Sequence, residues 1–200
     1  LYLFIIKMVR IRKKWKKFML PLIILAGPTT SNKSDTAIEL AEKINSEIIS
    51  ADSMQVYKYF NIGTAKVTPA DRVRIPHHLI DILEPDQEFS AFDFKTMALA
   101  HTRELHSQGK VPIITGGTGL YIKALCEGYD CAVQINPEIK KQVQSDIQTK
   151  GLPEMHRELR QIDPNSAERI PPLDRQRIAR AISVYRQTGT PFSKFSKGNS

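Results

Sequence analysis

The chain has 200 residues, a length that suits one ordinary domain, or one domain and a fragment. Its residues are 41% apolar and 25% charged, which is typical of a soluble globular protein and excludes a chain too polar to bury a core. Its formal net charge of +8 favours an anionic partner, whether a phosphorylated small molecule, a nucleic acid or a membrane surface, without choosing among them. The two cysteines, Cys126 and Cys131, have no further Cys/His set around them, so we expect reduced thiols of a cytosolic protein rather than a zinc site.

Residues 1–18 form a basic amino-terminal extension. Its first part, LYLFIIK, is too short to span a bilayer, and IRKKWKKF concentrates lysine and arginine in a few positions. A membrane-surface arm or an RNA-binding arm would have this composition. Because MLPLIILAG, from Met19, is a natural beginning for a strand-first α/β domain, we instead expect the extension to be an upstream artefact or dispensable, with no membrane partner.

Residues 19–124 alternate between strand and helix signals. Short apolar runs predict buried strands at residues 22–26, 47–50 and 111–115. Helical spacing begins after Ser34, and again after the capping-box pair Ser90 and Asp93. Strands separated by helices predict a parallel sheet that collects ligands at the carboxyl ends of its strands.

Residues 125–200 have a helical pattern with few strand signals. Helix starts are predicted at Asn136, Asp163 and Asp174, each placed before a helical stretch. No late strand returns to the sheet, so the core of three predicted strands is expected to be incomplete. The sequence therefore predicts an α/β core over residues 19–124 and a helical region over residues 125–200.

The stretch GPTTSNKS, residues 27–34, departs at one position from the phosphate-binding pattern G-x-x-x-x-G-K-[ST]. It follows a predicted strand and precedes a helix, so its backbone N–H groups would point at phosphate oxygens. Lys33 would reach the same phosphates and Ser34 would hold Mg²⁺. Asn32 replaces a glycine, but asparagine enters the left-handed backbone region with modest strain, so we expect a phosphate site. The alternative is a chance turn before a helix.

Three further groups are candidates for binding or catalysis, and the first two follow predicted strands. Asp52 directly follows a strand, where a carboxylate can bind Mg²⁺ or accept a proton, although a cap or turn aspartate would look the same. The glycines of GGTG, residues 116–119, permit close approach of a ligand but also suit a tight strand-to-helix turn. His77 and His78 would face opposite ways in a strand, so structural or RNA-facing roles are favoured over a metal site.

The run DRQRIARA, residues 174–181, places arginines on one face of a predicted helix. Arg177 and Arg180 are three residues apart and share that face, while Ile178 belongs to the apolar face. A basic helix face suits the phosphates of a nucleic acid, and a simply solvated face is the alternative.

Taken together, these stretches resemble the tRNA dimethylallyltransferase family, also called the tRNA isopentenyltransferases. The matching pieces span about residues 20–193 and are, in order, LAGPTTSNKS, EIISADSMQVYKYFNIGTAKVTP, PHHLIDILEPDQEFSAFDF, GKVPIITGGTGLYIKAL and DRQRIARAISVYRQTGTPFS. The series ISADSMQVY, NIGTAK and PHHLIDI is the most specific part. The resemblance implies an α/β fold with a P-loop NTPase-like three-layer core, a parallel sheet and a helical inserted subdomain that binds tRNA.

The resemblance also implies a reaction: a cytoplasmic monomer transfers dimethylallyl from dimethylallyl diphosphate to N6 of the adenosine 3′ to the anticodon, in the anticodon arm of tRNA. Lys33 and a Mg²⁺ ion at Ser34 would neutralise the leaving pyrophosphate, and Asp52 would be the general base. The implied diphosphate contacts are Gly27, Pro28, Thr29, Thr30, Ser31, Asn32, Lys33 and Ser34. The implied tRNA contacts are Asp52, Ser53, Met54, Gln55, Thr118, Gln176, Arg177, Ile178, Ala179 and Arg180.

Departures from the family pattern keep two other hypotheses open. Asn32 replaces the family's glycine, and the turn Pro171-Pro172-Leu173-Asp174 stands where a His-Pro-Asn-Asp-like turn is common. Family members are longer, so this chain is expected to lack about their last third. The alternatives are a non-catalytic remnant that binds RNA or phosphate and a small P-loop phosphotransferase, although nothing in phosphotransferase chemistry calls for the ADSMQVY run.

Overall fold

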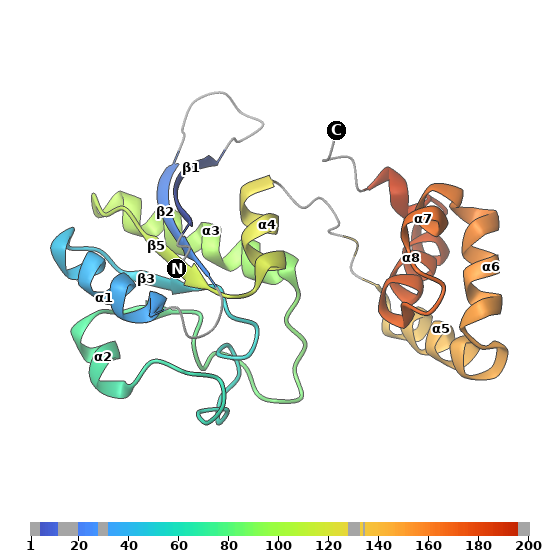
Figure 1. Ribbon diagram of the computed structural model, residues 1–200, viewed down its shortest axis with the longest axis horizontal. Coiled ribbons are helices and arrows are strands. Elements are labelled where there is room, and N and C mark those ends of the chain that lie inside the picture. The colour runs from blue at the N-terminus through green and yellow to red at the C-terminus, as the bar shows by residue number, and fades with distance from the viewer. Residues whose placement is uncertain (1–4, 12–19, 28–31, 128–132, 134, 196–200) are drawn as a thin grey trace. The chain divides into compact units, whose positions relative to one another are not determined.

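The computed structural model describes residues 5–11, 20–27, 32–127, 133 and 135–195. The chain divides into two compact units, Leu1–Gly128 and Tyr129–Ser200 (Figure 1). Every described strand belongs to the first unit, whereas the described part of the second is helical. None of the helices over the described residues combines the length and apolarity needed to cross a membrane.

A five-stranded sheet, in the order β1-β2-β5-β3-β4, forms the centre of the first unit. The four strands that run parallel are β2 (Leu20–Ala26), β5 (Ile113–Gly116), β3 (Ile48–Ser50) and β4 (His77–His78). This confirms the predicted parallel sheet. The apolar runs of the sequence mark β2, β3 and β5, whereas β4 has only two residues and is too short to produce a recognisable pattern.

Two helices, α1 (Lys33–Lys43) and α3 (Ala91–Ser107), cover the sheet. The chain passes from β2 through α1 to β3, two positions along the sheet, continues to the neighbouring strand β4, and returns from there through α3 to β5, two positions the other way. Right-handed crossovers in opposite directions put the two helices on opposite faces, which produces the layered arrangement seen in Figure 1. The shorter helices α2 (Pro69–Arg74) and α4 (Gly119–Glu127) complete the unit.

Local signals in the sequence determine where α3 begins. The hydroxyl of Ser90 accepts a hydrogen bond from the backbone N–H of Asp93, and the Asp93 carboxylate accepts one from the backbone N–H of Ser90 at 2.9 Å. The predicted capping box is therefore confirmed, because both donors at the helix start are satisfied reciprocally.

Strand β1 (Ile5–Ile11) was not anticipated from the sequence. It pairs antiparallel with β2 along its whole length, from Ile5 opposite Ala26 to Ile11 opposite Leu20. Its sequence, IIKMVRI, is rich in β-branched residues, so a signal was available. Part of the amino-terminal extension thus lies on the sheet, beside the strand that leads into the phosphate-loop sequence. That the extension is dispensable stays a prediction.

The second unit consists of four α-helices and a short 3-10 helix over its described residues: α5 (Pro137–Lys150), α6 (Leu152–Ile162), α7 (Pro164–Arg169), α8 (Arg175–Thr188) and η1 (Phe192–Lys194). The predicted helix starts are confirmed, since the side chains of Asn136, Asp163 and Asp174 each accept a hydrogen bond from a backbone N–H in the following turn. A shared apolar core, which includes Val143, Met155 and Ile178, holds the helices together.

Candidate functional site

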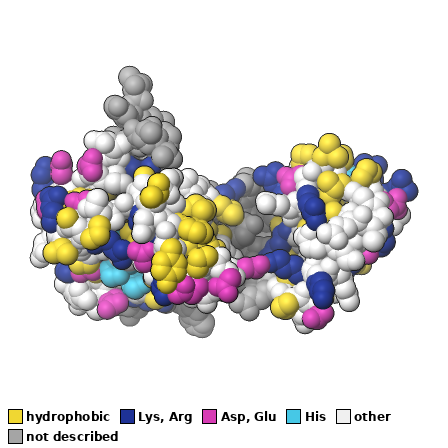
Figure 2. All heavy atoms as spheres, turned by 90° about the horizontal axis from the view of Figure 1, so that it is seen from below, with side chains coloured by type: hydrophobic (Ala, Val, Ile, Leu, Met, Phe, Trp, Pro, Cys, Tyr) yellow, Lys and Arg dark blue, Asp and Glu magenta, His cyan; other side chains and the backbone are white. Residues whose placement is uncertain are grey.

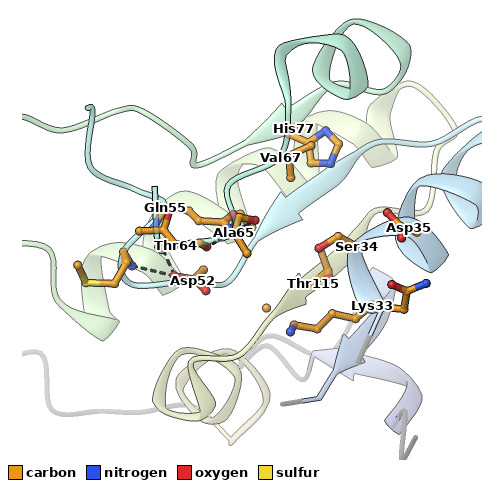
Figure 3. A pocket seen from close by; sticks show the side chains of 15 residues that line it. Lys33, Ser34, Asp35, Asp52, Gln55, Thr64, Ala65, Val67, His77 and Thr115 are labelled. Carbon is orange, nitrogen blue, oxygen red and sulfur yellow. Dashed lines mark hydrogen bonds between the residues drawn. The ribbon is translucent and has the colours of Figure 1, made fainter. Parts of the chain in front are cut away.

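A pocket of about 410 Å³ opens at the carboxyl ends of the parallel strands (Figure 3). Its walls come from the start of α1, the segment after β3, the loop before α2, His77 of β4 and the end of β5. The pocket lies at the edge of the sheet where the sequence predicts ligands to collect. It brings together side chains that are far apart in the sequence.

The predicted phosphate loop contributes Asn32, Lys33 and Ser34 to this pocket. Helix α1 begins at Lys33, so the amino-terminal end of the helix lies at the pocket wall, where an anion would be favourable. Gly27 is described but does not line the pocket. The remaining predicted diphosphate contacts, Pro28, Thr29, Thr30 and Ser31, lie outside the described residues.

Asn32 adopts the left-handed conformation predicted for its position, with φ 56° and ψ 22°. It is the N-cap of α1, yet its side chain makes no capping hydrogen bond. Its backbone carbonyl accepts hydrogen bonds from the N–H and the hydroxyl of Thr36. The asparagine therefore preserves the backbone shape that a glycine would adopt here, at a modest energetic cost.

Asp52 lies in the turn after β3 and lines the pocket. Its Oδ1 accepts hydrogen bonds from the backbone N–H groups of Met54 at 2.8 Å and Gln55 at 3.3 Å, drawn as dashed lines in Figure 3. Its Oδ2 makes no hydrogen bond with any described residue. Asp52 is thus both a turn aspartate and a pocket carboxylate: one oxygen fixes the side chain and the other is left to meet a ligand.

The turn after β5 is joined to the turn after β3. The backbone N–H of Ser53 donates to Oγ1 of Thr118 at 2.9 Å, which connects two of the predicted tRNA contacts. A methyl group on Gly116 would lie 2.2 Å from the carbonyl oxygen of Ala51. Gly116 is therefore required because the backbone at Ala51 lies against it, not because a ligand does. This contact packs the end of β5 against the end of β3.

Gln55, a predicted tRNA contact, uses its side chain inside the protein. It is 8% exposed, its Oε1 accepts a hydrogen bond from the Ser50 hydroxyl, and its Nε2 donates to the carbonyls of Thr64 and Ala65, both at 3.1 Å. Because all of these groups are occupied, the Gln55 side chain holds the opposite wall of the pocket in place.

Lys66 is a second internal support that the sequence gave no reason to single out. Its side chain is 4% exposed, and its ammonium donates to the carbonyl of Tyr57, to Oδ1 of Asn61 and to Oδ1 of Asp81 at 2.7 Å. The backbone N–H of Asp81 in turn donates to the carbonyl of Gln55. Burial opposes ionisation of Asp81, but hydrogen bonds from Lys66 and Arg72 outweigh it and lower the pKa of its carboxyl.

His77 and Thr115 also line the pocket and were not predicted as ligand contacts. Nδ1 of His77 lies 2.7 Å from the carbonyl of Ile75, so that nitrogen carries the proton and Nε2 is left as an acceptor when the ring is neutral. Burial lowers the pKa of His77, which favours the neutral ring. The hydroxyl of Thr115 is buried without a hydrogen-bond partner.

Oxygen groups in the pocket suit a Mg²⁺ ion. No group of three or more His, Cys, Asp or Glu residues able to hold a metal is found in the described part of the chain. Mg²⁺ needs few protein ligands, because it keeps several waters and is commonly bound through one or two carboxylates or hydroxyls and the substrate's phosphates. The hydroxyl of Ser34 lines the pocket and could be one such ligand, with the diphosphate and water supplying the others.

The predicted tRNA contacts on α8, in the second unit, include both buried and exposed residues. The side chains of Ile178 and Ala179 are 0% and 8% exposed and belong to the apolar core, so their role as tRNA contacts stays a prediction. Gln176 and Arg177 are exposed, and Arg180 donates to the carbonyl of Val133 at 3.0 Å. In the view of Figure 2, Lys and Arg side chains of this unit are interspersed with Asp and Glu, so a solvated face and an RNA-binding face both remain consistent.

Two family models match the sequence: IPP transferase over residues 55–200 and isopentenyl transferase over residues 20–81. The curated tRNA dimethylallyltransferase of Syntrophobacter fumaroxidans is 46% identical over 178 residues, which cover 89% of this chain and 52% of the relative. The tRNA dimethylallyltransferase 2 of Geotalea uraniireducens is 49% identical over 174 residues, covering 87% and 56% respectively. The chain spans about half the length of the curated relatives it matches.

Solved structures agree with the sequence comparison. A eukaryotic dimethylallyltransferase, described in crystallographic snapshots of its action on tRNA, is 32% identical with a TM-score of 0.71 over 88% of this chain and 44% of that one. The tRNA isopentenylpyrophosphate transferase of Bacillus halodurans is 37% identical with a TM-score of 0.53, covering 84% and 56%.

Proposed function

This chain belongs to the IPP transferase family, and on that premise we propose that the protein transfers a dimethylallyl group from dimethylallyl diphosphate to N6 of the adenosine 3′ to the anticodon of tRNA. The observation that carries the proposal is the pocket. It joins an anion-favouring helix start, with Lys33 and Ser34, to a carboxylate oxygen of Asp52 that bonds to none of the described residues. A prenyl transfer needs these two groups at the same place. We take the protein to act in the cytoplasm as a monomer.

The diphosphate of the donor binds at the start of α1 in this proposal. Backbone N–H groups of the first turn and the ammonium of Lys33 stabilise its negative charge, which increases at the leaving oxygen as the bond breaks. A Mg²⁺ ion held by Ser34 would neutralise the remaining charge on the pyrophosphate. The interaction is stronger with the departing pyrophosphate than with the bound donor, as catalysis requires.

Asp52 acts on the acceptor amine. The target adenosine leaves its stack so that N6 can enter the pocket. As N6 forms a bond to the first carbon of the dimethylallyl group, the carbon–oxygen bond breaks and its electron pair leaves with the pyrophosphate. Oδ2 of Asp52 takes the proton that N6 loses, while the backbone bonds to Oδ1 keep the carboxylate oriented.

Asp52→Asn tests the proposal, because it keeps the Oδ1 acceptor and removes the base. We expect transfer of labelled dimethylallyl to a tRNA anticodon arm to fall by about 10²-fold or more, with little change in the affinity for dimethylallyl diphosphate. Asp86→Asn, at an exposed loop position outside the pocket, is the matched control and should keep full transfer.

Undiminished transfer by Asp52→Asn would contradict the assigned base. The two alternatives are separated by the same samples: a phosphate-binding remnant binds the donor without transferring it, and a phosphotransferase turns over ATP.

A further inference from the structure

Thr115, near the end of β5, has a buried hydroxyl without a partner. The residue is 8% exposed, and its Oγ1 makes no hydrogen bond with any described residue. Leaving a buried hydroxyl unsatisfied costs about 1–3 kcal/mol. Among the described residues, the other buried side-chain atom without a hydrogen-bond partner is Nδ1 of His101, and His101 does not line the pocket. The unpaired hydroxyl in the pocket therefore calls for a functional explanation.

The strand register places Thr115 on the face of the sheet that α1 covers. Thr115 lies opposite Leu25 of β2 and Ser50 of β3, and residues in register share a face of the sheet. Leu25 and Ile113 both pack in the apolar cluster that α1 covers, so Thr115, two residues after Ile113, lies on that same face at its carboxyl end. Thr115 and Ser34, both labelled in Figure 3, line the same pocket.

Neighbouring groups do not compete for this hydroxyl. The Ser50 hydroxyl, in register with it, already donates to Oε1 of Gln55 at 3.2 Å. The backbone carbonyl of Thr115 accepts from the N–H of Ala51 at 2.7 Å, which fixes the strand end and leaves the side chain as the open group. A hydroxyl held on a central strand of the sheet needs little ordering when a ligand arrives.

We propose that the Thr115 hydroxyl is a further ligand-binding group of this pocket, donating a hydrogen bond to a phosphoryl oxygen of the diphosphate bound at the start of α1. The identity of the ligand rests on the proposed function. A hydroxyl bonded to a charged oxygen makes one of the stronger kinds of hydrogen bond. Binding therefore satisfies a group that the free protein leaves unpaired, so part of the affinity comes from removing that unfavourable state.

Two substitutions test this inference, one that removes the hydroxyl of residue 115 and one that keeps it. Thr115→Val keeps the shape and removes the hydroxyl, whereas Thr115→Ser keeps the hydroxyl. We expect Thr115→Val to raise the calorimetric Kd for inorganic pyrophosphate about 10-fold or more, while the Tm of the ligand-free protein stays the same or rises. Thr115→Ser should bind within about 3-fold of the parent chain.

Thr102→Val is the matched control, because Thr102 is a fully buried threonine of α3 whose hydroxyl is already bonded to the carbonyl of Ala98 at 2.7 Å. It should leave the Kd for pyrophosphate unchanged.

Titrations with Mg²⁺ and with a chelator distinguish a phosphoryl oxygen from a metal-bound water as the partner of the Thr115 hydroxyl. An effect of Thr115→Val that requires Mg²⁺ overturns the assignment to a phosphoryl oxygen and points to a metal-bound water.

An unchanged Kd in Thr115→Val overturns the inference, and so does a parent chain that binds no pyrophosphate. A fall in Tm that accompanies weaker binding would make Thr115 a structural residue only. If the parent chain binds pyrophosphate but transfers no prenyl group, the proposed function fails, while the role of Thr115 is still decided by the Kd values alone.

Discussion

Asn32 lies at a backbone position that most side chains avoid. Its φ of 56° belongs to the left-handed region, which raises the energy of an ordinary L-residue by about 1–2 kcal/mol. Asparagine tolerates this region better than most residues, and glycine enters it without a steric penalty. The replacement of glycine by asparagine in the phosphate loop is thus a change of side chain that leaves the backbone conformation as it is.

Substitutions at Asn32 should rank by their tolerance of positive φ. We expect Asn32→Gly to keep the free energy of unfolding within about 1 kcal/mol of the parent, and Asn32→Ala to lower it by about 1 kcal/mol. Asn32→Val, which is β-branched, should lower it further. Urea unfolding of the four proteins measures the order. A valine variant as stable as the parent would show that the left-handed conformation is not maintained in solution.

Buried side chains connect the loops around the pocket, in addition to the backbone hydrogen bonds of the sheet. Gln55 connects the turn after β3 to the loop at Thr64 and Ala65, and Lys66 connects that loop to Asp81, beyond β4. The loop contains Ala65 at φ 48°, and Asp81 itself has φ 56°, so both segments adopt conformations that require external support. These buried polar contacts keep the pocket wall in one shape.

Lys66→Met should destabilise this wall more than Lys58→Met, its matched control. Both lysines pair with a carboxylate at 2.7 Å, but the Lys66 side chain is 4% exposed and that of Lys58 is 41% exposed. Removing the buried ammonium takes the hydrogen-bond donor from two partly buried acceptors, the Tyr57 carbonyl and Oδ1 of Asp81, so we expect Lys66→Met to lower the free energy of unfolding by about 2–3 kcal/mol. Lys58→Met should lower it by less than about 1 kcal/mol.

Denaturant unfolding measures both losses, and amide hydrogen exchange over residues 55–66 locates them. Equal losses in the two variants, or faster exchange spread evenly over the first unit, would show that Lys66 does not specifically support the pocket wall.

Across the whole molecule, the two units have separate apolar cores. The core of the helical unit draws on α5, α6, α7 and α8, and the described core of the first unit includes residues of the sheet and α1. Polar contacts inside the helical unit reinforce this independence: Arg186 pairs with Asp146 at 2.7 Å and with Glu158 at 2.9 Å. A unit with its own core and its own ion pairs has what it needs to fold alone.

Residues 129–200, produced alone, should therefore fold as a helical unit. We expect a helical circular dichroism spectrum and a cooperative thermal transition. Met155→Ala, at a fully buried position, should lower the free energy of unfolding by about 2–5 kcal/mol, whereas Leu173→Ala, at a position 76% exposed, should change it little. A segment that melts without cooperativity, or in which both substitutions have the same effect, would show that the helical unit depends on the rest of the chain.

The sequence by itself determined the features that depend on neighbouring residues. Asn136, Asp163 and Asp174 start helices because a short polar side chain reaches the next turn, and Asn32 signals a left-handed backbone because of its own sterics. Apolar runs marked β2, β3 and β5, and the strand–helix alternation indicated the parallel sheet. The resemblance to the family extended this local information to the reaction that we propose.

Only the tertiary structure decided which of these groups meet. Thr118 bonds to Ser53 across 65 positions, β1 pairs with β2, and the Gln55 side chain bonds to Ser50 and to the loop at Thr64. The unpaired hydroxyl of Thr115 is likewise visible only once its neighbours are known. The physical reason is that burial and hydrogen-bond satisfaction depend on every segment packed around an atom, and a linear pattern records only those close in sequence.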